Sequence, residues 1–234
     1  MSERKIFSII ILCAVIPAVV IIGWFLTSGK QYYLLSLLII AVSMVPFFLS
    51  LERKKLRVRE LVLTASVVAI AVASRGAFLF LPQIKPMCAV LIIASTAFGA
   101  EFGFISGALS MLISNFIYGQ GMWTPFQMMG MGVTVFVCAL IIRSFRINNR
   151  VIIGIISGIL CFLLYGVIVD LSSVFMMLSE FNVKSIASIY LSGVTFNLIH
   201  GVTTGIITAL IQPQINEKLE RIKIKYGVFS EKKK

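Results

Sequence analysis

Acidic residues and histidine are scarce in this sequence. Only nine of its 234 residues are Asp or Glu and one is His, against 21 Lys or Arg. Charged residues make up 13% of the chain and hydrophobic residues 59%, whereas ordinary globular domains carry about 25% charged residues. This shortage of charge excludes a soluble single-core domain and a disordered tail protein.

Catalytic sequence motifs are also absent. There is no phosphate-binding GxxxxGK[ST] loop, no HExxH metal motif and no GxSxG nucleophile motif. Within the apolar runs the ionisable candidates are Arg75 and Asp170, which are too few for an intramembrane protease. We therefore expect a protein that is not an enzyme and that binds no metal or cofactor.

Ion-coupled secondary transport has little support in the sequence. Such transporters usually contain internal repeats, broken helices and several buried carboxylates. Here Asp170 is the one candidate carboxylate, and no repeat is evident. If the protein transports a solute, we expect another subunit to supply the energy.

The four cysteines indicate packing rather than chemistry. Cys13, Cys88, Cys138 and Cys161 all lie in apolar runs, and no pair has the spacing of metal ligands. We predict that all four are buried, reduced thiols that fill space between helices.

Long apolar runs are the feature that the sequence has in abundance. A helix that crosses a bilayer needs about 20 apolar residues. The runs without charge are 6–29, 31–51, 61–74, 86–100, 102–142, 151–169 and 185–216. The longest run must hold two spans, separated by the Gly-rich turn Tyr118–Pro125, and the third continues past Arg75. We predict an all-α, polytopic membrane protein with eight spans.

The distribution of basic residues between the loops predicts an orientation. Seventeen of the 21 Lys and Arg residues fall at the N-terminus, in the turns 52–60 and 143–150, and in the C-terminal tail. The opposite side holds Lys30, Lys85 and Lys184. Because basic loops stay in the cytoplasm, we predict N-in/C-in topology in a bacterial plasma membrane. The lipid bilayer thus accounts for the basic excess, and we expect no nucleic-acid partner.

Alanine recurs at every fourth position of the third span, at Ala65, Ala69, Ala73 and Ala77. Residues four apart lie on one slowly drifting face of a helix. Small side chains allow another helix to approach closely in lipid. On spacing alone, this face packs either inside the molecule or against another protein.

Glycines recur with the same spacing in other spans. The sets are Gly99/Gly103/Gly107, Gly154/Gly158 and Gly201/Gly205. Small residues four apart are common where helices of one membrane protein pack together. We predict internal packing at these positions, in a tight bundle rather than an open pore.

The turn within residues 102–142 combines amides, hydroxyls, aromatic rings and glycines. Its candidate binding residues are Asn115, Tyr118, Gln120, Trp123, Thr124 and Gln127. Glycines let the backbone approach a ligand, and aromatic and amide groups line many ligand sites. The alternative is an interfacial aromatic belt around an ordinary turn. A belt explains the aromatic residues, but Asn115 and Gln127 are polar groups at helix ends that need partners.

Arg75 lies about 15 residues into its span, a depth at which a charge normally faces the bundle interior or a wet cavity. We expect Asp170 as its partner, either in a structural ion pair or in a ligand site near the outer surface. The short loop after this span adds Gln83 and Lys85 to the same region.

The last span and the tail beyond it carry two weaker signals. Asn197 and His200 are three residues apart and share a helix face. There an interhelical hydrogen bond is favoured over ligand contact. Residues 216–226 alternate charged and apolar side chains, which predicts an amphipathic helix at the inner leaflet.

Residues 58–212 resemble the S component, the substrate-binding membrane subunit, of energy-coupling factor (ECF) vitamin transporters. The alanine-striped span begins this region. The stretch Gly103–Met128, with Ser114-Asn115-Phe116 and Trp123-Thr124-Pro125-Phe126-Gln127-Met128, looks like the cobalamin-type branch. The resemblance implies a six-helix core, preceded by two extra transmembrane helices in 1–57 and followed by a basic cytoplasmic tail, 213–234.

The resemblance also implies a mechanism and its residues. Such proteins bind a vitamin at the outer face and dock on a transmembrane coupling subunit carried by two cytoplasmic ATPases. Their docking face is the alanine-rich helix, which corresponds here to Ala65, Ala69 and Ala73. Their pocket uses the loop after that helix and the outer ends of the last three core helices. Here these positions include Gln83, Lys85, Trp123, Thr124, Gln127, Asp170 and Asn197.

Cobalamin or a related corrinoid is the substrate that we expect. It is large and amide-rich, which suits a neutral turn of amides and aromatic rings. A small anionic vitamin would favour more cations than the predicted outer side carries. The alternatives are an S component for another vitamin or a nucleobase-like precursor, a membrane scaffold that binds no small molecule, and a stand-alone secondary transporter.

Overall fold

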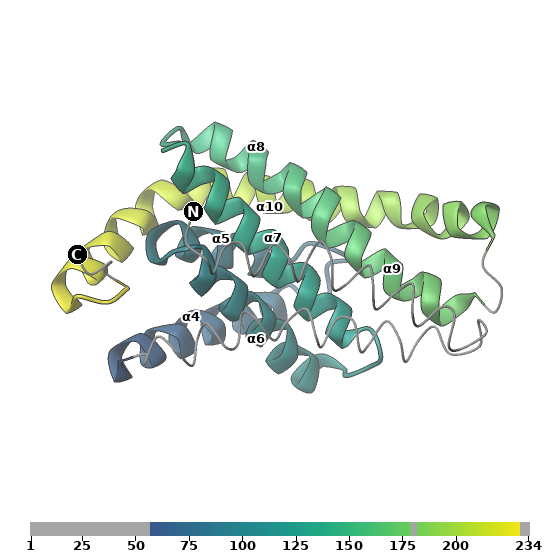
Figure 1. Cartoon of the computed structure of the whole chain (residues 1–234), viewed down its shortest axis with the longest axis horizontal. Helices are drawn as coiled ribbons and strands as arrows, with labels where there is room; N and C mark the ends of the chain where they lie inside the picture. The colour runs from purple at the N-terminus through teal and green to yellow at the C-terminus, as the bar shows by residue number, and fades with distance from the viewer. Residues whose placement is uncertain (1–56, 179–181, 230–234) are drawn as a thin grey trace, which may run out of the picture.

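The computed structural model describes residues 57–178 and 182–229. Within these ranges the chain is helical and contains no strand. The elements, labelled as in Figure 1, are α4 (Val58–Ala77), α5 (Met87–Phe98), α6 (Ala100–Tyr118), α7 (Thr124–Ser144), α8 (Arg150–Leu160), the π-helix η2 (Cys161–Tyr165), α9 (Gly166–Met177) and α10 (Val183–Tyr226). Two extra spans were predicted for residues 1–57. Of these residues only Arg57 is described, so the two spans lie outside the described residues.

Five of the described helices are long and apolar enough to cross a membrane. They are α4, α6, α7, the joined segment Arg150–Met177 and α10. The α5 helix is apolar too, but at 12 residues it is shorter. The class predicted from the sequence, an all-helical membrane protein, is therefore confirmed. The number of eight spans and their orientation stay predictions.

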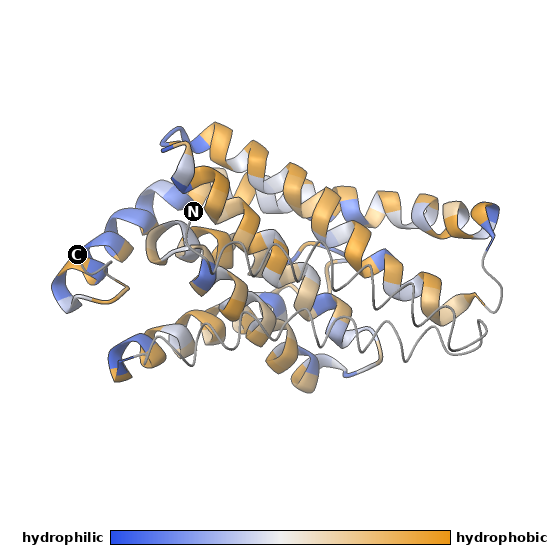
Figure 2. Ribbon diagram, in the orientation of Figure 1, coloured by the Kyte–Doolittle hydropathy of each residue, from blue (hydrophilic) through white to orange (hydrophobic). Residues whose placement is uncertain are grey.

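The described helices form an elongated bundle whose two ends differ in polarity. The α6 and α7 helices pack against each other, and α10 runs along α8, α5 and α9. Hydrophilic residues gather where α4 and α8 begin and along the last part of α10 (Figure 2). We call this the charged end. The opposite, loop end carries the α4–α5 loop and the α6–α7 turn.

Four glycines allow α8 and α10 to cross at close range. A Cβ atom on Gly158 would lie 2.9 Å from the carbonyl oxygen of Gly201, and one on Gly154 would lie 2.7 Å from that of Gly205. Either distance is shorter than a normal carbon–oxygen contact. The small-residue spacing thus serves packing inside the molecule, as the sequence predicted.

The core is apolar and includes three of the cysteines. Cys88, Cys138 and Cys161 are free and buried, which confirms the prediction of packing thiols at these positions. Cys13 lies outside the described residues. No group of three or more His, Cys, Asp or Glu residues in the described ranges has the arrangement of a metal site.

The last helix is longer than a single span. It continues for 44 residues to Tyr226 and passes Pro213 without ending. The helix predicted for residues 216–226 is therefore present, as the continuation of α10. The chain then turns at Gly227, and Val228 is 2% exposed in the core.

Candidate functional site

The predicted polar turn is a connected hydrogen-bond network at the loop end. Asn115, near the end of α6, is fully buried. Its side-chain amide donates to the hydroxyl oxygen of Thr124 at 2.9 Å and to Oε1 of Gln127 at 2.8 Å. The Thr124 hydroxyl in turn donates to Oε1 of Gln120 at 2.6 Å. The turn therefore brings together the four polar residues that the sequence singled out.

Arg75 joins this network from α4. Its Nη1 atom donates to Oδ1 of Asn115 at 2.8 Å and to the hydroxyl of Ser114. The guanidinium carbon lies 5.8 Å from the centre of the Tyr118 ring, within the range of a cation–π interaction. One cation thereby links α4 to α6 and, through Asn115, to α7.

The ion pair predicted between Arg75 and Asp170 is not formed. Among the described residues, the guanidinium of Arg75 bonds to neutral groups of α6, whereas Asp170 bonds to Asn197. Neutral acceptors on the neighbouring helix satisfy Nη1 of Arg75 without a buried carboxylate, whereas its buried Nε has no hydrogen-bond partner among the described residues. Sequence alone could not rank these acceptors against the distant carboxylate.

Two contacts of Arg75 were missed at the sequence level. These are Ser114 and, more weakly, the sulfur of Met111, which lies 3.8 Å from Nη1. Met111, Ser114, Asn115 and Tyr118 follow the spacing i, i+3, i+4, i+7, which places them on one face of α6. That spacing could have identified these four residues as the face of α6 that contacts Arg75.

Trp123 and Gln120 form the accessible side of the turn. Trp123 is 37% exposed and directly precedes α7. A Cβ atom on Gly121 would lie 2.4 Å from the Trp123 ring, so only glycine permits this ring position. Asn115 donates both of its amide hydrogens within the protein, whereas Gln120 and Trp123 have exposed surface.

The α4–α5 loop places Gln83 and Lys85 at the same end of the bundle. Gln83 has a positive φ of 59°, a conformation that is uncommon for residues other than glycine. Burial, and secondly the nearby charge of Arg75, lowers the pKa of the Lys85 ammonium. Two cations therefore lie near each other beside the polar turn.

Asp170 and Asn197 form a separate contact between α9 and α10. The amide of Asn197 donates to a carboxylate oxygen of Asp170 at 2.6 Å. A Cβ atom on Gly193 would lie 2.4 Å from that carboxylate, so glycine keeps this surface of α10 open to it. The predicted interhelical hydrogen bond of Asn197 is confirmed. No described hydrogen bond joins this pair to the Arg75 network.

His200 serves packing in the described structure. Its ring meets that of Tyr165 edge-on, with 5.1 Å between the centres. His200 is 4% exposed, in keeping with an interior position. The interhelical hydrogen bond predicted for His200 is not formed at Nε2, which is buried without a hydrogen-bond partner among the described residues.

The alanine face of α4 lies at the surface of the described chain. Ala65, Ala69 and Ala73 are exposed, as is Ile70 beside them at 58%. The opposite face, with Val68 and Ala71, is buried. The alanines therefore do not contribute to the core of the described residues.

The described chain also has an open cavity of 660 Å³ at the charged end. It lies between the start of α8 and the last part of α10, with Arg150, Gln212, Glu217 and Arg221 among its lining residues. None of the residues predicted to bind substrate lines it. Its lining contains two basic residues, Arg150 and Arg221, and two acidic residues, Glu217 and Glu220, so it has no excess of either charge.

Comparison with known proteins gives one match. The family model described as "ECF-type riboflavin transporter, S component" matches residues 55–217, which is more than two thirds of the 234 residues. No curated protein and no solved structure matches the chain. The matched region contains α4 to α9 and most of α10, and with them the polar turn and the alanine face.

Proposed function

Because the chain belongs to the family of ECF-type riboflavin transporter S components, we propose that it captures a vitamin for import driven by partner subunits. Membership makes it a substrate-binding membrane subunit and not an enzyme. The proposal adds where the ligand binds and what kind of ligand it is. The residues at the loop end of the bundle support both points.

The observation that carries the proposal is the organisation of this end. Arg75, Asn115 and Thr124 hold the ends of α4, α6 and α7 together through hydrogen bonds of buried groups. Trp123 and Gln120 lie next to these hydrogen-bonded residues and have exposed surface. A rigid base with an aromatic ring and an amide beside it is a typical surface for a neutral, partly aromatic ligand.

Two vitamins are candidates for the ligand. Riboflavin is the vitamin named by the family description, and its planar ring system with a hydrogen-bonding edge suits a tryptophan and several amides. Cobalamin, the substrate expected from the stretch Gly103–Met128, presents many amides to the same groups. Both vitamins are compatible with a turn beside which the described residues place the cations Arg75 and Lys85.

The proposal includes a membrane topology. Eight spans with both termini in the cytoplasm of a bacterial cell would place the polar turn outside and the charged end inside. In support, 17 of the 21 Lys and Arg residues fall on the predicted inner side. The described helices add an apolar bundle with hydrophilic residues concentrated at its charged end (Figure 2).

The proposed partners are a transmembrane coupling subunit and two cytoplasmic ATPases. We assign contact with the coupling subunit to Ala65, Ala69 and Ala73. Their exposure supports this, because a stripe of small residues at the surface allows a second helix to approach closely in lipid. The lipid bilayer surrounds the rest of the bundle.

Calorimetric titration of the purified chain with riboflavin, cobalamin, cobinamide and thiamine tests the proposal. We expect tight one-to-one binding of riboflavin or of cobalamin, and the ligand that binds decides between them. Absence of binding to a well-folded sample would overturn vitamin capture and favour a membrane scaffold. Uptake by cells that lack the coupling ATPases, abolished by an ionophore, would instead indicate a stand-alone secondary transporter.

A further inference from the structure

The C-terminal residues return to the bundle and pack into its charged end. Val228 is 2% exposed and belongs to the main core cluster. The ring of Phe229 lies 5.5 Å from that of Phe98 and 5.1 Å from that of Phe102, measured between ring centres. We call residues 219–229 the C-terminal strap. Its end is thus anchored where α5 passes into α6.

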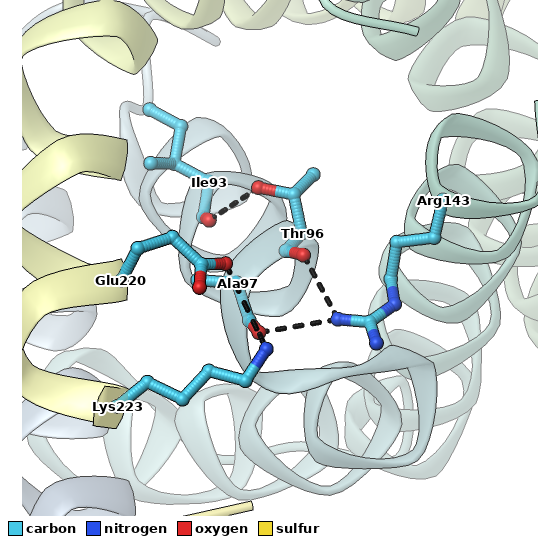
Figure 3. A network of polar contacts seen from close by, with 6 residues as sticks. All are labelled: Ile93, Thr96, Ala97, Arg143, Glu220 and Lys223. Atoms are coloured by element: carbon cyan, nitrogen blue, oxygen red, sulfur yellow. Dashed lines mark hydrogen bonds and ion pairs between the residues drawn. The ribbon is translucent and has the colours of Figure 1, made fainter. Parts of the chain in front are cut away.

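A second anchor lies on the last turn of α5, whose carbonyl groups have no partners within the helix. The ammonium of Lys223 donates to the carbonyl oxygen of Ala97 at 2.7 Å (Figure 3). Arg143 of α7 donates to the same oxygen at 3.1 Å and to that of Thr96 at 3.0 Å. Cations at a helix C-terminus also interact favourably with its dipole. The strap and α7 therefore cap α5 together.

A third anchor lies on the first turn of α4. The backbone N–H of Phe229 donates to Oε1 of Glu60 at 2.8 Å, while Oε2 of Glu60 accepts from the backbone N–H of Arg57 at 3.0 Å. The Arg57 side chain donates to the carbonyl oxygen of Gly227 at 3.4 Å. One glutamate thus caps the start of α4 and holds the end of the strap.

The end of the strap is held in an unfavourable backbone conformation. Phe229 has a positive φ of 50°, which is rare for a bulky residue and costs free energy. Its contacts with Glu60, Phe98 and Phe102 must offset that cost. Loss of these contacts would let the backbone of Phe229 relax to a more favourable conformation.

We propose that the C-terminal strap is a releasable clamp that joins the start of α4 to the end of α5. While it is in place, α4 cannot tilt away from α5 at the charged end. The link to transport rests on the proposed function, because α4 also carries the alanine face assigned to the coupling subunit. Release of the strap would free α4 to adjust when that subunit docks.

Amide hydrogen exchange of the purified full chain in nanodiscs tests the clamp without any ligand. Phe229→Ala removes two aromatic contacts, so we expect the first-turn amides of α4 to exchange on the order of tenfold faster. Phe145→Ala is the matched control, because that phenylalanine lies after α7 and is 75% exposed. Unchanged exchange at the start of α4 in Phe229→Ala would overturn the clamp.

A milder variant covers the case in which Phe229→Ala does not fold. Lys223→Met keeps the aliphatic stem and removes the donor to Ala97, together with the 3.7 Å ion pair that Lys223 forms with Glu220 one turn earlier. We expect exchange at the end of α5 to rise about threefold, in keeping with the loss of one charged hydrogen bond that Arg143 partly replaces. If the amides at the end of α5 exchange at the same rate in Lys223→Met as in the unsubstituted chain, Lys223 does not anchor the strap to α5. That result would overturn a clamp that includes α5.

A covalent bridge tests the link to transport. The double variant Glu60→Cys/Phe229→Cys would be joined with a short bifunctional maleimide, because the described native cysteines are buried. With the coupling module in proteoliposomes, we expect at least tenfold slower vitamin uptake after bridging and unchanged vitamin binding. Uptake at the rate of the unbridged double variant would overturn release during transport. Failure of the unsubstituted chain to bind any vitamin would overturn the proposed function and leave the exchange result standing.

Discussion

Arg75 of α4 and Asn115 of α6 are joined by a 2.8 Å hydrogen bond from the guanidinium to the side-chain carbonyl. Asn115 is fully buried, and its amide hydrogens go to Thr124 and Gln127. A single neutral side chain therefore connects three helices at the loop end. The polar turn depends on this residue for its shape.

Replacement of Asn115 should disturb the fold more than any other change in the turn. In Asn115→Leu the partners on Arg75, Thr124 and Gln127 lose a buried hydrogen bond each, and we expect a loss of about 3 kcal/mol in stability. Thermal unfolding in detergent measures the loss. Asn148→Leu, at an exposed position after α7, is the control. Equal midpoints for the two variants would show that the network does not support the fold.

Removal of the Trp123 ring should weaken vitamin binding. Trp123 is 37% exposed, so Trp123→Ala also removes buried surface, and its effect on the fold must be measured separately from its effect on binding. If the vitamin stacks on it, we expect binding to weaken about tenfold. Titration calorimetry gives the affinity and thermal unfolding checks the fold. Affinity equal to that of the unsubstituted chain would assign this ring to the interfacial belt.

Lys85 should make stability depend on pH in the alkaline range. Burial first, and Arg75 second, lowers the pKa of Lys85 below its usual 10.5. The folded state thus binds this proton less tightly than the unfolded chain. Stability should rise as the pH increases from the lowered pKa toward 10.5, and the penalty should be complete below that window. We expect Lys85→Met to flatten this part of the thermal midpoint–pH curve. Parallel curves for the two proteins would contradict it.

A methyl group at the crossing of α8 and α10 should be destabilising. In a helix without close neighbours, Gly→Ala is stabilising by about 1 kcal/mol. In Gly201→Ala the new carbon would lie 2.8 Å from the carbonyl oxygen of Gly158, so the helices must separate. We expect a net loss of about 2 kcal/mol in thermal unfolding. Ile159→Ala, whose side chain is 52% exposed beside the crossing, should change the midpoint less.

A large side chain on the alanine face should uncouple transport from binding. Ala69 is exposed, so Ala69→Leu should keep the fold and the vitamin affinity. We expect vitamin uptake to fall at least tenfold, because a leucine prevents close approach of the coupling subunit. Ala187→Leu places the same change at an exposed position of α10. If both variants support full uptake and complex assembly, the docking face is elsewhere.

Much of the described fold could be predicted from the sequence because membrane helices leave strong local signals. Apolar length predicted the described spans, and the glycine pairs predicted the crossing of α8 and α10. The turn between α6 and α7 was likewise visible in Gly119 and Gly121, and the structure has it at residues 119–123. These features depend on short stretches of chain, in which composition and spacing decide the structure.

Side-chain partnerships between distant segments could not be predicted in the same way. Arg75 was assigned to Asp170 by charge alone, yet Ser114 and Asn115 are the acceptors within its reach. The strap could not be predicted from the sequence because Glu60 and Ala97, to which it is anchored, are far from Phe229 and Lys223 in the chain. Such contacts follow from how helices cross, which a single sequence does not specify.

The π-helix η2 sets the angular relation between the two halves of the longest joined span. Each residue of a helix advances the chain by about 100° around the axis, and a π-helical turn holds one residue more than an α-helical turn. Deletion of one residue between Cys161 and Tyr165 would therefore rotate α9 against α8 by about that angle. Gly154 and Gly158 would keep their contacts with α10, while Asp170 would swing away from Asn197. This short element therefore contributes the rotation of α9 relative to α8 about the helix axis, rather than additional length.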